Sequence, residues 1–327
     1  MKKAVLVSLL GISAVLNAQS YPPPAGQTGS TAIAASDPSI VAWATEATVV
    51  RGKQDISNAS SALASFGTPS LATGAPSGST LDVVSLGDGG SATVTFALPI
   101  TNETGYDFAV FENSFSDTFL ELAFVEVSSD GVNFFRFPSH SQTQTTTQIG
   151  GFGAVDCRYI NNLAGKYKIN YGTPFNLDDV PNNALLNKNS ITHVKVIDVV
   201  GSINATYATY DSYGNKINDP FTTPFNSGGF DLDAVGVIHQ AAGFRKMNDE
   251  KENMALFSIY PNPATDVVFL NTEKETAVVV YDLSGRIVKN LPAGEHKEIR
   301  VSDLTKGTYL FEVTIGEEKI TKRIIVK

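Results

Sequence analysis

Three glutamates stand inside an otherwise largely apolar stretch, from Tyr106 to Pro138. They are Glu112, Glu121 and Glu126. A carboxylate is costly to keep charged in apolar surroundings, so each is expected to face solvent, to meet a cation or to have a shifted pKa. Two carboxylates that face each other across a cleft are also the machinery of a glycoside hydrolase. Glu112 with Glu121 or Glu126 would supply such a pair.

A second group of acids points to a metal. Asp231 and Asp233 are two residues apart, so in a strand their side chains project from one face. Calcium takes several carboxylate and carbonyl oxygens, and we predict that Asp231 and Asp233 bind it with help from Glu112 or Asn113. The alternative is an edge turn with two solvated acids.

Other catalytic patterns are absent from the sequence. None of the four histidines has the spacing of an HExxH metal site, and no GxSxG motif is present. The single cysteine, Cys157, excludes a disulfide within the chain, and we expect it to be buried as a small hydrophobe.

We therefore expect a binding protein without catalytic activity. A glycoside hydrolase-like enzyme is one alternative, and an open cleft between Glu112 and Glu121 would favour it. A structural adhesin is the other, and a flat aromatic patch without a concave pocket would favour it.

The elements that must position the first three acids are predicted to be β-strands, because aromatic and β-branched residues fill them. Asp130-Gly131 is typical of a type I′ turn and predicts a hairpin between the second and third of them. Phe108, Phe124 and Phe134 are expected to lie in the core. The predicted strands of this domain include Tyr106–Glu112, Phe119–Ser128, Val132–Phe137, Ile191–Val200 and Phe230–Ile238.

Composition supports an all-β fold. The chain has 42% hydrophobic but only 17% charged residues, with 27 Gly and 15 Pro, which is typical of a turn-rich β protein. Residues 19–246 carry 20 acidic and 11 basic residues, so this part is acidic. An acidic surface repels phosphate backbones and anionic lipids, and we expect no nucleic-acid partner.

The 327 residues allow two unequal domains. Residues 1–18, with Lys2, Lys3 and the apolar run from Ala4 to Leu16, are typical of a secretory signal peptide cleaved after Ala18. No segment is long and apolar enough to predict a transmembrane helix. We predict a β-sandwich binding domain at 19–240, a linker at 241–256, where the strand pattern is lost, and a second, small β-sandwich at 257–327.

The second domain carries a recognisable set of motifs. It begins with Tyr260-Pro261-Asn262-Pro263 and continues through VYDLSGRIVKN, which contains Gly285, and DLTKGTYLFEV, which contains Gly307 and Tyr309. These motifs resemble the type A C-terminal sorting domain of the type IX secretion system. The resemblance implies a seven-stranded immunoglobulin-like sandwich, the type IX secretion machinery as partner, and a secreted or outer-surface location.

The first domain has a weaker resemblance. Phe124–Phe134 (FVEVSSDGVNF) and Gly229–Val237 (GFDLDAVGV) are similar to galactose-binding-like jelly rolls, the architecture of discoidin and carbohydrate-binding modules. They also resemble secreted bacterial surface proteins with relatives among corrinoid-uptake proteins. The resemblance implies a jelly-roll β-sandwich and an extracellular carbohydrate or small-molecule ligand such as a corrinoid.

Overall fold

The computed structural model describes residues 20–241, 258–271, 275–316 and 318–327. The predicted signal peptide and all but the first residue of the predicted linker lie outside these ranges. The chain divides into two compact units, Met1–Gly243 and Phe244–Lys327, and each is described by itself.

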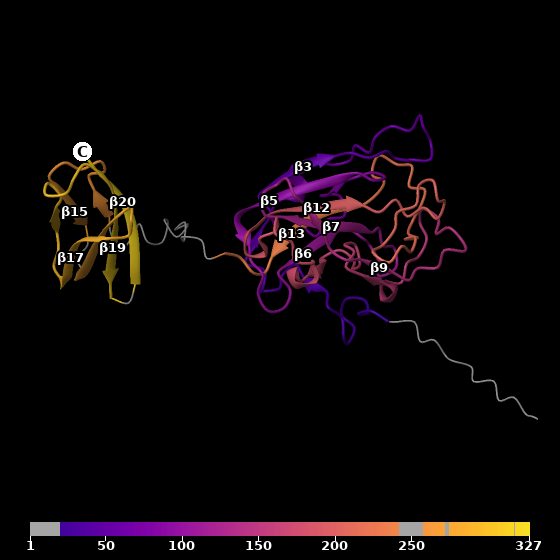
Figure 1. Ribbon diagram of the computed structural model, residues 1–327, viewed down its shortest axis with the longest axis horizontal. Helices are drawn as coiled ribbons and strands as arrows, with labels where there is room; N and C mark the ends of the chain where they lie inside the picture. The colour runs from indigo at the N-terminus through magenta and orange to yellow at the C-terminus, as the bar shows by residue number, and fades with distance from the viewer. Residues whose placement is uncertain (1–19, 242–257, 272–274, 317) are drawn as a thin grey trace, which may run out of the picture. The chain divides into compact units, whose positions relative to one another are not determined.

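The large unit is a β-sandwich, so the predicted all-β fold is confirmed (Figure 1). One sheet has the strand order β1-β11-β6-β13-β2, with β4 paired to β13. Its strands are β1 (Ile33–Ala34), β2 (Ala42–Trp43), β4 (Val84–Ser85), β6 (Phe108–Glu112), β11 (Tyr171–Phe175) and β13 (Asp231–Val237).

The second sheet has the order β3-β5-β12-β7-β8. It is made of β3 (Glu46–Val50), β5 (Ser91–Ile100), β7 (Ala123–Ser128), β8 (Phe135–Arg136) and β12 (Ile191–Asp198). A separate small ladder joins β9 (His140–Ser141) to β10 (Ile160–Asn161). Four short 3₁₀ helices lie in the connections: η1 (Pro69–Ala72), η2 (Cys157–Tyr159), η3 (Leu177–Asp179) and η4 (Lys188–Ser190).

The strand order is that of a jelly roll. The chain passes from one sheet to the other between β5 and β6, β6 and β7, β11 and β12, and β12 and β13. Such alternation winds two Greek keys into one sandwich. The core fills the space between the sheets with side chains from both, including Val94, Val125 and Val196 from one and Phe108, Val110 and Val235 from the other.

The predicted hairpin exists, but its turn is not the predicted one. Glu126 pairs with Arg136 and Val127 with Phe135, which joins β7 to β8. Gly131 has a φ of 75°, whereas Asp130 does not lie in the left-handed region that a type I′ turn requires. Instead the Asp130 carboxylate accepts hydrogen bonds from the backbone N–H groups of the two residues after Gly131, which holds a wider loop.

Burial supports two of the three predicted core phenylalanines. Phe108 and Phe124 are buried. Phe134 is only half-buried, because it precedes the two-residue strand β8 and its ring packs against the ammonium of Lys195, 3.7 Å from the ring centre. The lone Cys157 is buried as expected, and burial raises the pKa of its thiol to about 11.

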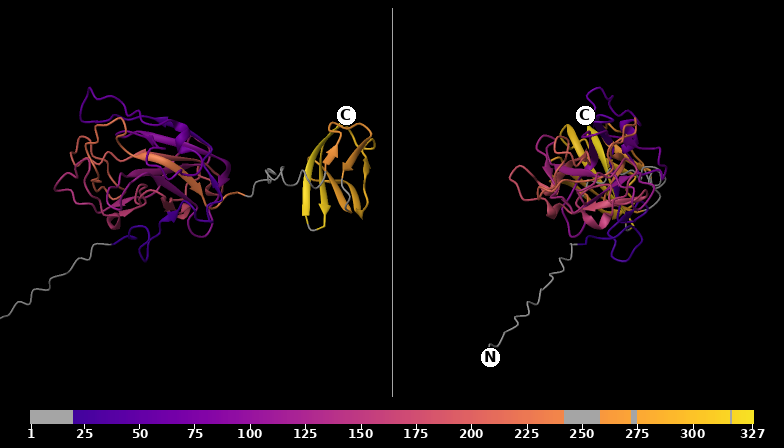
Figure 2. Two further views of the ribbon diagram at one scale, coloured as in Figure 1. Left: turned by 180° about the vertical axis from the view of Figure 1, so that it is seen from behind. Right: turned by 90° about the vertical axis from the view of Figure 1, so that its right-hand side faces the viewer.

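Long loops extend from one end of this sandwich, between β8 and β11 and between β12 and β13 (Figure 2). Hydrogen bonds connect these loops to each other. The Asp211 carboxylate accepts a hydrogen bond from the Ser141 backbone N–H at 2.8 Å, and Gln148 donates to the carbonyl oxygen of Gly201 at 3.0 Å.

In its described residues, the small unit is a sandwich of seven strands in two sheets, as the resemblance implies. The three-stranded sheet has the order β14-β15-β18 and the four-stranded sheet β17-β16-β19-β20. The strands are β14 (Ser258–Tyr260), β15 (Val267–Asn271), β16 (Thr276–Asp282), β17 (Ile287–Gly294), β18 (Glu298–Arg300), β19 (Gly307–Ile315) and β20 (Glu318–Val326). Their inward side chains, such as Val268, Val280, Ile299 and Phe311, form its own core.

Candidate functional site

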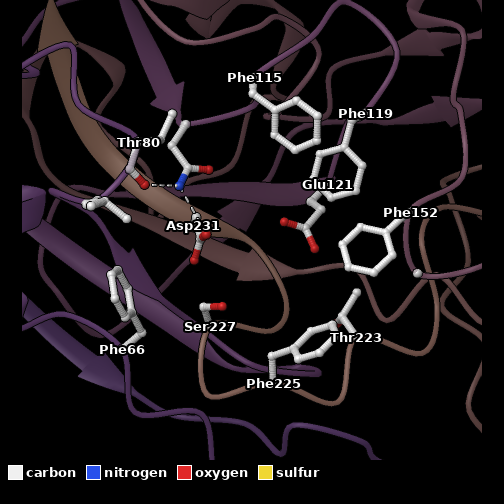
Figure 3. Close-up of a pocket in the computed structure, with 13 residues that line it drawn as sticks. Phe66, Thr80, Phe115, Phe119, Glu121, Phe152, Thr223, Phe225, Ser227 and Asp231 are labelled. Atoms are coloured by element: carbon white, nitrogen blue, oxygen red, sulfur yellow. Dashed lines mark hydrogen bonds between the residues drawn. The ribbon is translucent and has the colours of Figure 1, made fainter.

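A cavity of about 270 Å³ in the large unit gathers both chemical groups that the sequence offers, phenylalanine rings and carboxyls (Figure 3). Its aromatic lining is Phe66, Phe115, Phe119, Phe152 and Phe225. The carboxyls are those of Glu121 and Asp231, and polar neighbours include Asn113, Thr80, Thr223 and Ser227.

Four segments that are distant in sequence build this cavity. The connection from β6 to β7 supplies Asn113 to Glu121, and the connection from β3 to β4 supplies Phe66 and Thr80. Phe152 comes from the loop after β9, and Thr223 to Asp231 come from the segment that enters β13. The jelly-roll crossovers bring these loops together, as is common for binding sites on a rigid β scaffold.

The aromatic side chains form a row. The ring centroids of Phe115 and Phe119 are 4.6 Å apart, those of Phe119 and Phe152 are 6.2 Å apart, and those of Phe152 and Phe225 are 5.8 Å apart. Phe115 is 66% and Phe152 78% exposed. Exposed, adjacent apolar rings at the mouth of a cavity are typical of a ligand or partner site.

Glu121 lies at the inner side of the cavity. It is 8% exposed, and its carboxylate points into the space between the rings of Phe119, Phe152 and Phe225 (Figure 3). No described residue donates a hydrogen bond to it. Burial, and after it the charge of Asp231, raises the pKa of Glu121 well above its usual value.

The backbone around Glu121 is fixed by packing. Leu120 and Leu122 on either side are fully buried. Gly165 lies against the carbonyl oxygen of Glu121 with a φ of 79°, and a Cβ at that position would overlap this oxygen. The close approach holds Glu121 in place without a side-chain partner.

Asp231 is the second carboxyl of the cavity. It is 7% exposed, and its Oδ2 accepts a hydrogen bond from Asn113 Nδ2 at 3.2 Å, while its buried Oδ1 has no partner among the described residues. Asn113 also donates to the Thr80 carbonyl oxygen at 2.8 Å. Burial raises the pKa of Asp231 to about 6, although the nearby Ser85 hydroxyl, the hydrogen bond from Asn113 and the charge of Arg51 act to lower it.

Glu112 is not among the residues that line the cavity. It is buried opposite Leu232 of β13, and its Oε2 accepts a hydrogen bond from the Ser114 backbone N–H at 2.8 Å. Its Oε1 is buried, and no described group donates to it. Burial, followed by the charge of Asp231, raises the pKa of Glu112 well above its usual value.

Asp233 is also buried, and its Oδ2 accepts no hydrogen bond from the part of the chain that the structure describes. Burial raises the pKa of Asp233 to about 7, with the charge of Asp82 as a smaller cause. The alternative that Asp231 and Asp233 are solvated acids is therefore wrong. The ladder between β13 and β6 is irregular between Leu232 and Ala234, which includes Asp233.

The four predicted calcium ligands are only partly brought together. Asn113 and Asp231 are hydrogen-bonded, and Glu112 directly precedes Asn113. Within the described ranges, no group of three or more His, Cys, Asp or Glu side chains is arranged to hold a metal ion. Calcium binding stays a prediction.

The predicted hydrolase pair does not face across an open cleft. Glu121 lines the cavity, whereas Glu112 is buried and does not line it. Glu126 forms an ion pair with Arg136 across β7 and β8, with 2.8 Å between Oε1 and Nη2. Of these three glutamates, Glu126 thus pairs with a cation, whereas Glu112 and Glu121 have raised pKa values.

Sequence reasoning missed the aromatic lining. Phe115, Phe152 and Phe225 lie in segments rich in Ser, Thr, Gly and Pro, where a strand core is not expected. A phenylalanine inside a polar loop is not part of a strand that packs into the core. The position of these three residues in such loops could therefore have marked them as candidate site residues. Phe119 was predicted as the first residue of a strand, but β7 begins at Ala123.

The motif residues of the small unit have clear structural tasks. Asn262 binds β20 twice, since its side chain donates to the Arg323 carbonyl oxygen at 2.8 Å and accepts from the Ile325 N–H at 2.9 Å. The Tyr309 hydroxyl donates to the Thr305 carbonyl oxygen at 2.7 Å, as in the tyrosine corner of immunoglobulin-like sandwiches. Gly285, with a φ of 81°, lies in the turn between β16 and β17. Tyr260 is exposed, Pro261 and Pro263 follow cis peptide bonds, and Gly307 begins β19.

Residues 258–327 match the family model described as the secretion system C-terminal sorting domain, which is the type IX sorting domain that the motifs resemble. A domain of this family indicates export, cell-surface attachment and interaction with the type IX secretion machinery. The predicted secreted or outer-surface location is therefore confirmed. Of the helices in the described part of the chain, none is long and apolar enough to cross a membrane.

No curated protein matches the chain. Similar solved structures include the BSP domain of a biofilm-associated protein, at 11% identity over 72% of this chain and 48% of that one, with a TM-score of 0.18. Another is the Ruminococcus gnavus beta-glucuronidase, at 12% identity over 72% and 35%, with a TM-score of 0.17. The chain thus spans less than half the length of either, and similarities this weak carry no argument about activity.

Proposed function

We propose that the large unit of this exported protein is a non-catalytic binding module, and that the cavity between Phe119, Glu121 and Asp231 takes its ligand, a carbohydrate or another small organic molecule. One observation carries the proposal. The cavity combines exposed phenylalanine rings with two inward carboxyls that the described residues leave partly or wholly without partners.

The carboxyl groups of the cavity favour binding because they lack part of their hydrogen bonding. A buried carboxyl that lacks a hydrogen-bond partner destabilises the folded protein, and a ligand that supplies the partner recovers this loss. Rings such as Phe115 and Phe152 offer flat apolar faces against which a sugar ring or other small molecule can pack. The cavity suits a single ring or a similar small group better than the whole of a large molecule such as a corrinoid.

Of the alternatives, an adhesin with a flat aromatic patch is less well supported, because the exposed rings line a concave space. A glycoside hydrolase is the second candidate, since Glu121 and Asp231 share one cavity and both have a raised pKa. Release of a chromophore from aryl glycosides, abolished in Glu121→Gln, would favour the hydrolase over simple binding.

The proposal is tested by screening the full chain against neutral saccharides and small organic molecules with saturation-transfer NMR. We expect at least one class to bind, and we expect Phe119→Ala to weaken this binding at least tenfold. Phe134→Ala is the matched control, because this half-buried phenylalanine lies outside the cavity lining. Equal weakening by both variants, or no binding by any compound, would contradict the proposal.

A further inference from the structure

The charge of the cavity is one-sided. Its lining includes two carboxyls, Glu121 and Asp231, and within the described residues it includes no Lys, Arg or His side chain. Glu112 and Asp233, the other two buried acids of β6 and β13, are also without cations, since the ion pairs of the described residues include none of the four. The cavity therefore has a negative potential that no basic side chain of its described lining offsets.

The nearest basic group is already engaged. The Arg51 guanidinium donates hydrogen bonds to the carbonyl oxygens of Phe66 at 2.8 Å and Gly67 at 2.7 Å, and to that of Ser85. It thereby fastens the segment that includes Phe66 to β4. Its charge acts on the pKa of Asp231 only as the last of four causes, after burial, the Ser85 hydroxyl and the Asn113 amide.

The rings favour the same kind of ligand as the carboxyls. The face of a phenylalanine ring is negative and attracts cations, most strongly where water is excluded. Phe119 stacks on Phe115 with 4.6 Å between ring centroids, and the row continues through Phe152 to Phe225. The phenylalanine rings offer no ligand atoms to a metal ion, which needs oxygen or nitrogen ligands. An organic cation contacts both surfaces at once.

We propose that the ligand carries an ammonium group, which contacts the phenylalanine row and pairs with the carboxylates of Glu121 and Asp231. This inference rests on the proposed function and narrows its ligand class. Two sources share this chemistry: a quaternary ammonium compound, such as choline, and a primary amine on a sugar, such as glucosamine. The quaternary group is less hydrated and matches the ring faces, whereas the primary group donates hydrogen bonds to carboxylates.

The experiment uses pairs of compounds that differ in charge. Choline is compared with 3,3-dimethylbutan-1-ol, its uncharged carbon analogue, and glucosamine with N-acetylglucosamine. Isothermal titration of the full chain at pH 7 is expected to give at least a tenfold tighter Kd for the cation of one pair or both. The pair that shows the preference identifies the source.

Variants separate charge from shape. Glu121→Gln keeps the side chain's size but removes its charge, so it is expected to abolish the preference for the cation and to change the neutral compound's affinity less than threefold. Phe119→Ala is expected to weaken both members of the pair. Phe134→Ala, outside the cavity, is expected to leave both affinities unchanged.

Three results would overturn the inference, and they are distinguishable from failure of the proposed function. Equal affinity within both pairs, or binding of neutral saccharides alone, removes the ammonium requirement but leaves the cavity as a ligand site. A cation preference that survives in Glu121→Gln places the cation elsewhere. Binding of neither the paired compounds nor any compound of the wider screen removes both proposals.

Discussion

Replacing Asp231 by asparagine should make the large unit more stable at neutral pH, which is unusual for a change at a buried polar residue. Burial raises the pKa of this carboxyl from its ordinary 3.8 to about 6. A raised pKa means that the folded protein holds the proton more tightly than the unfolded chain does. The stability from this group is therefore complete below pH 3.8 and is lost as the pH rises to about 6.

The magnitude follows from the shift. One pKa unit corresponds to about 1.4 kcal/mol, so about two units cost the folded protein about 3 kcal/mol at pH 7. An asparagine at this position has no charge to lose, and its side-chain oxygen can still accept the hydrogen bond from Asn113. Asp231→Asn is thus expected to equal the wild type near pH 4 and to exceed it by about 3 kcal/mol at pH 7, or about 6–12 °C in Tm.

The assay uses the chain's only tryptophan, Trp43. It lies on β2, which pairs with the strand that includes Asp231, and its ring centroid is 5.4 Å from that of Phe111. Its fluorescence therefore reports unfolding of the large unit and not of the small one. Urea unfolding of the full chain between pH 4 and pH 8 gives the difference between variant and wild type at each pH.

Asp211→Asn is the control of opposite sign. Burial acts to raise the pKa of Asp211, but hydrogen bonds from Ser141, Asn215 and Tyr213 outweigh it and the pKa is lowered. This variant should be destabilised at pH 7 and less so as the pH falls. If the gap in stability between Asp231→Asn and wild type does not change with pH, folding does not raise the pKa of Asp231, and this carboxyl is not destabilised by burial.

Three further predictions concern calcium, the core and the sorting domain. If the four predicted ligands bind calcium, the ion at about 100 Kd stabilises the large unit by about 2.7 kcal/mol relative to excess chelator, and identical melting curves would exclude the site. Phe108→Ala should cost about 3–5 kcal/mol in urea unfolding, since this ring is fully buried, and a loss below about 1 kcal/mol would show that it is not core. A signal-bearing reporter fused to residues 241–327 should reach the surface of a host with the type IX system, and Asn262→Ala should reduce its export because two hydrogen bonds to β20 are lost, each worth about 1 kcal/mol. A reporter that stays in the periplasm would contradict the sorting role, and unchanged export of the variant would show that Asn262 is dispensable.

The sequence predicts the architecture well where one local rule acts alone. Alternation of apolar residues in Ser91–Ile100 and Ile191–Asp198 fixes which side chains enter the core. The type I′ turn predicted at Asp130-Gly131 does not form, because the aspartate side chain can make other hydrogen bonds. Its carboxylate binds the backbone N–H groups ahead of it, and this competes with the tight turn that the residue pair otherwise favours.

The cavity is less predictable because it depends on which loops meet. Carboxyls in apolar surroundings can be recognised from sequence, and Glu112, Glu121 and Glu126 were. Whether each meets a cation is decided by its strand partner: Glu126 lies opposite Arg136, whereas Glu112 lies opposite Leu232. Such pairings join residues far apart in the chain, and no local pattern encodes them.

A crystal structure of the full chain with its best-binding compound would show directly whether the cavity is the ligand site. We expect the compound to lie in the cavity, in contact with both the Phe119 ring and the Glu121 carboxylate. A compound bound at full occupancy on another surface of the large unit, with the cavity filled only by water, would contradict it.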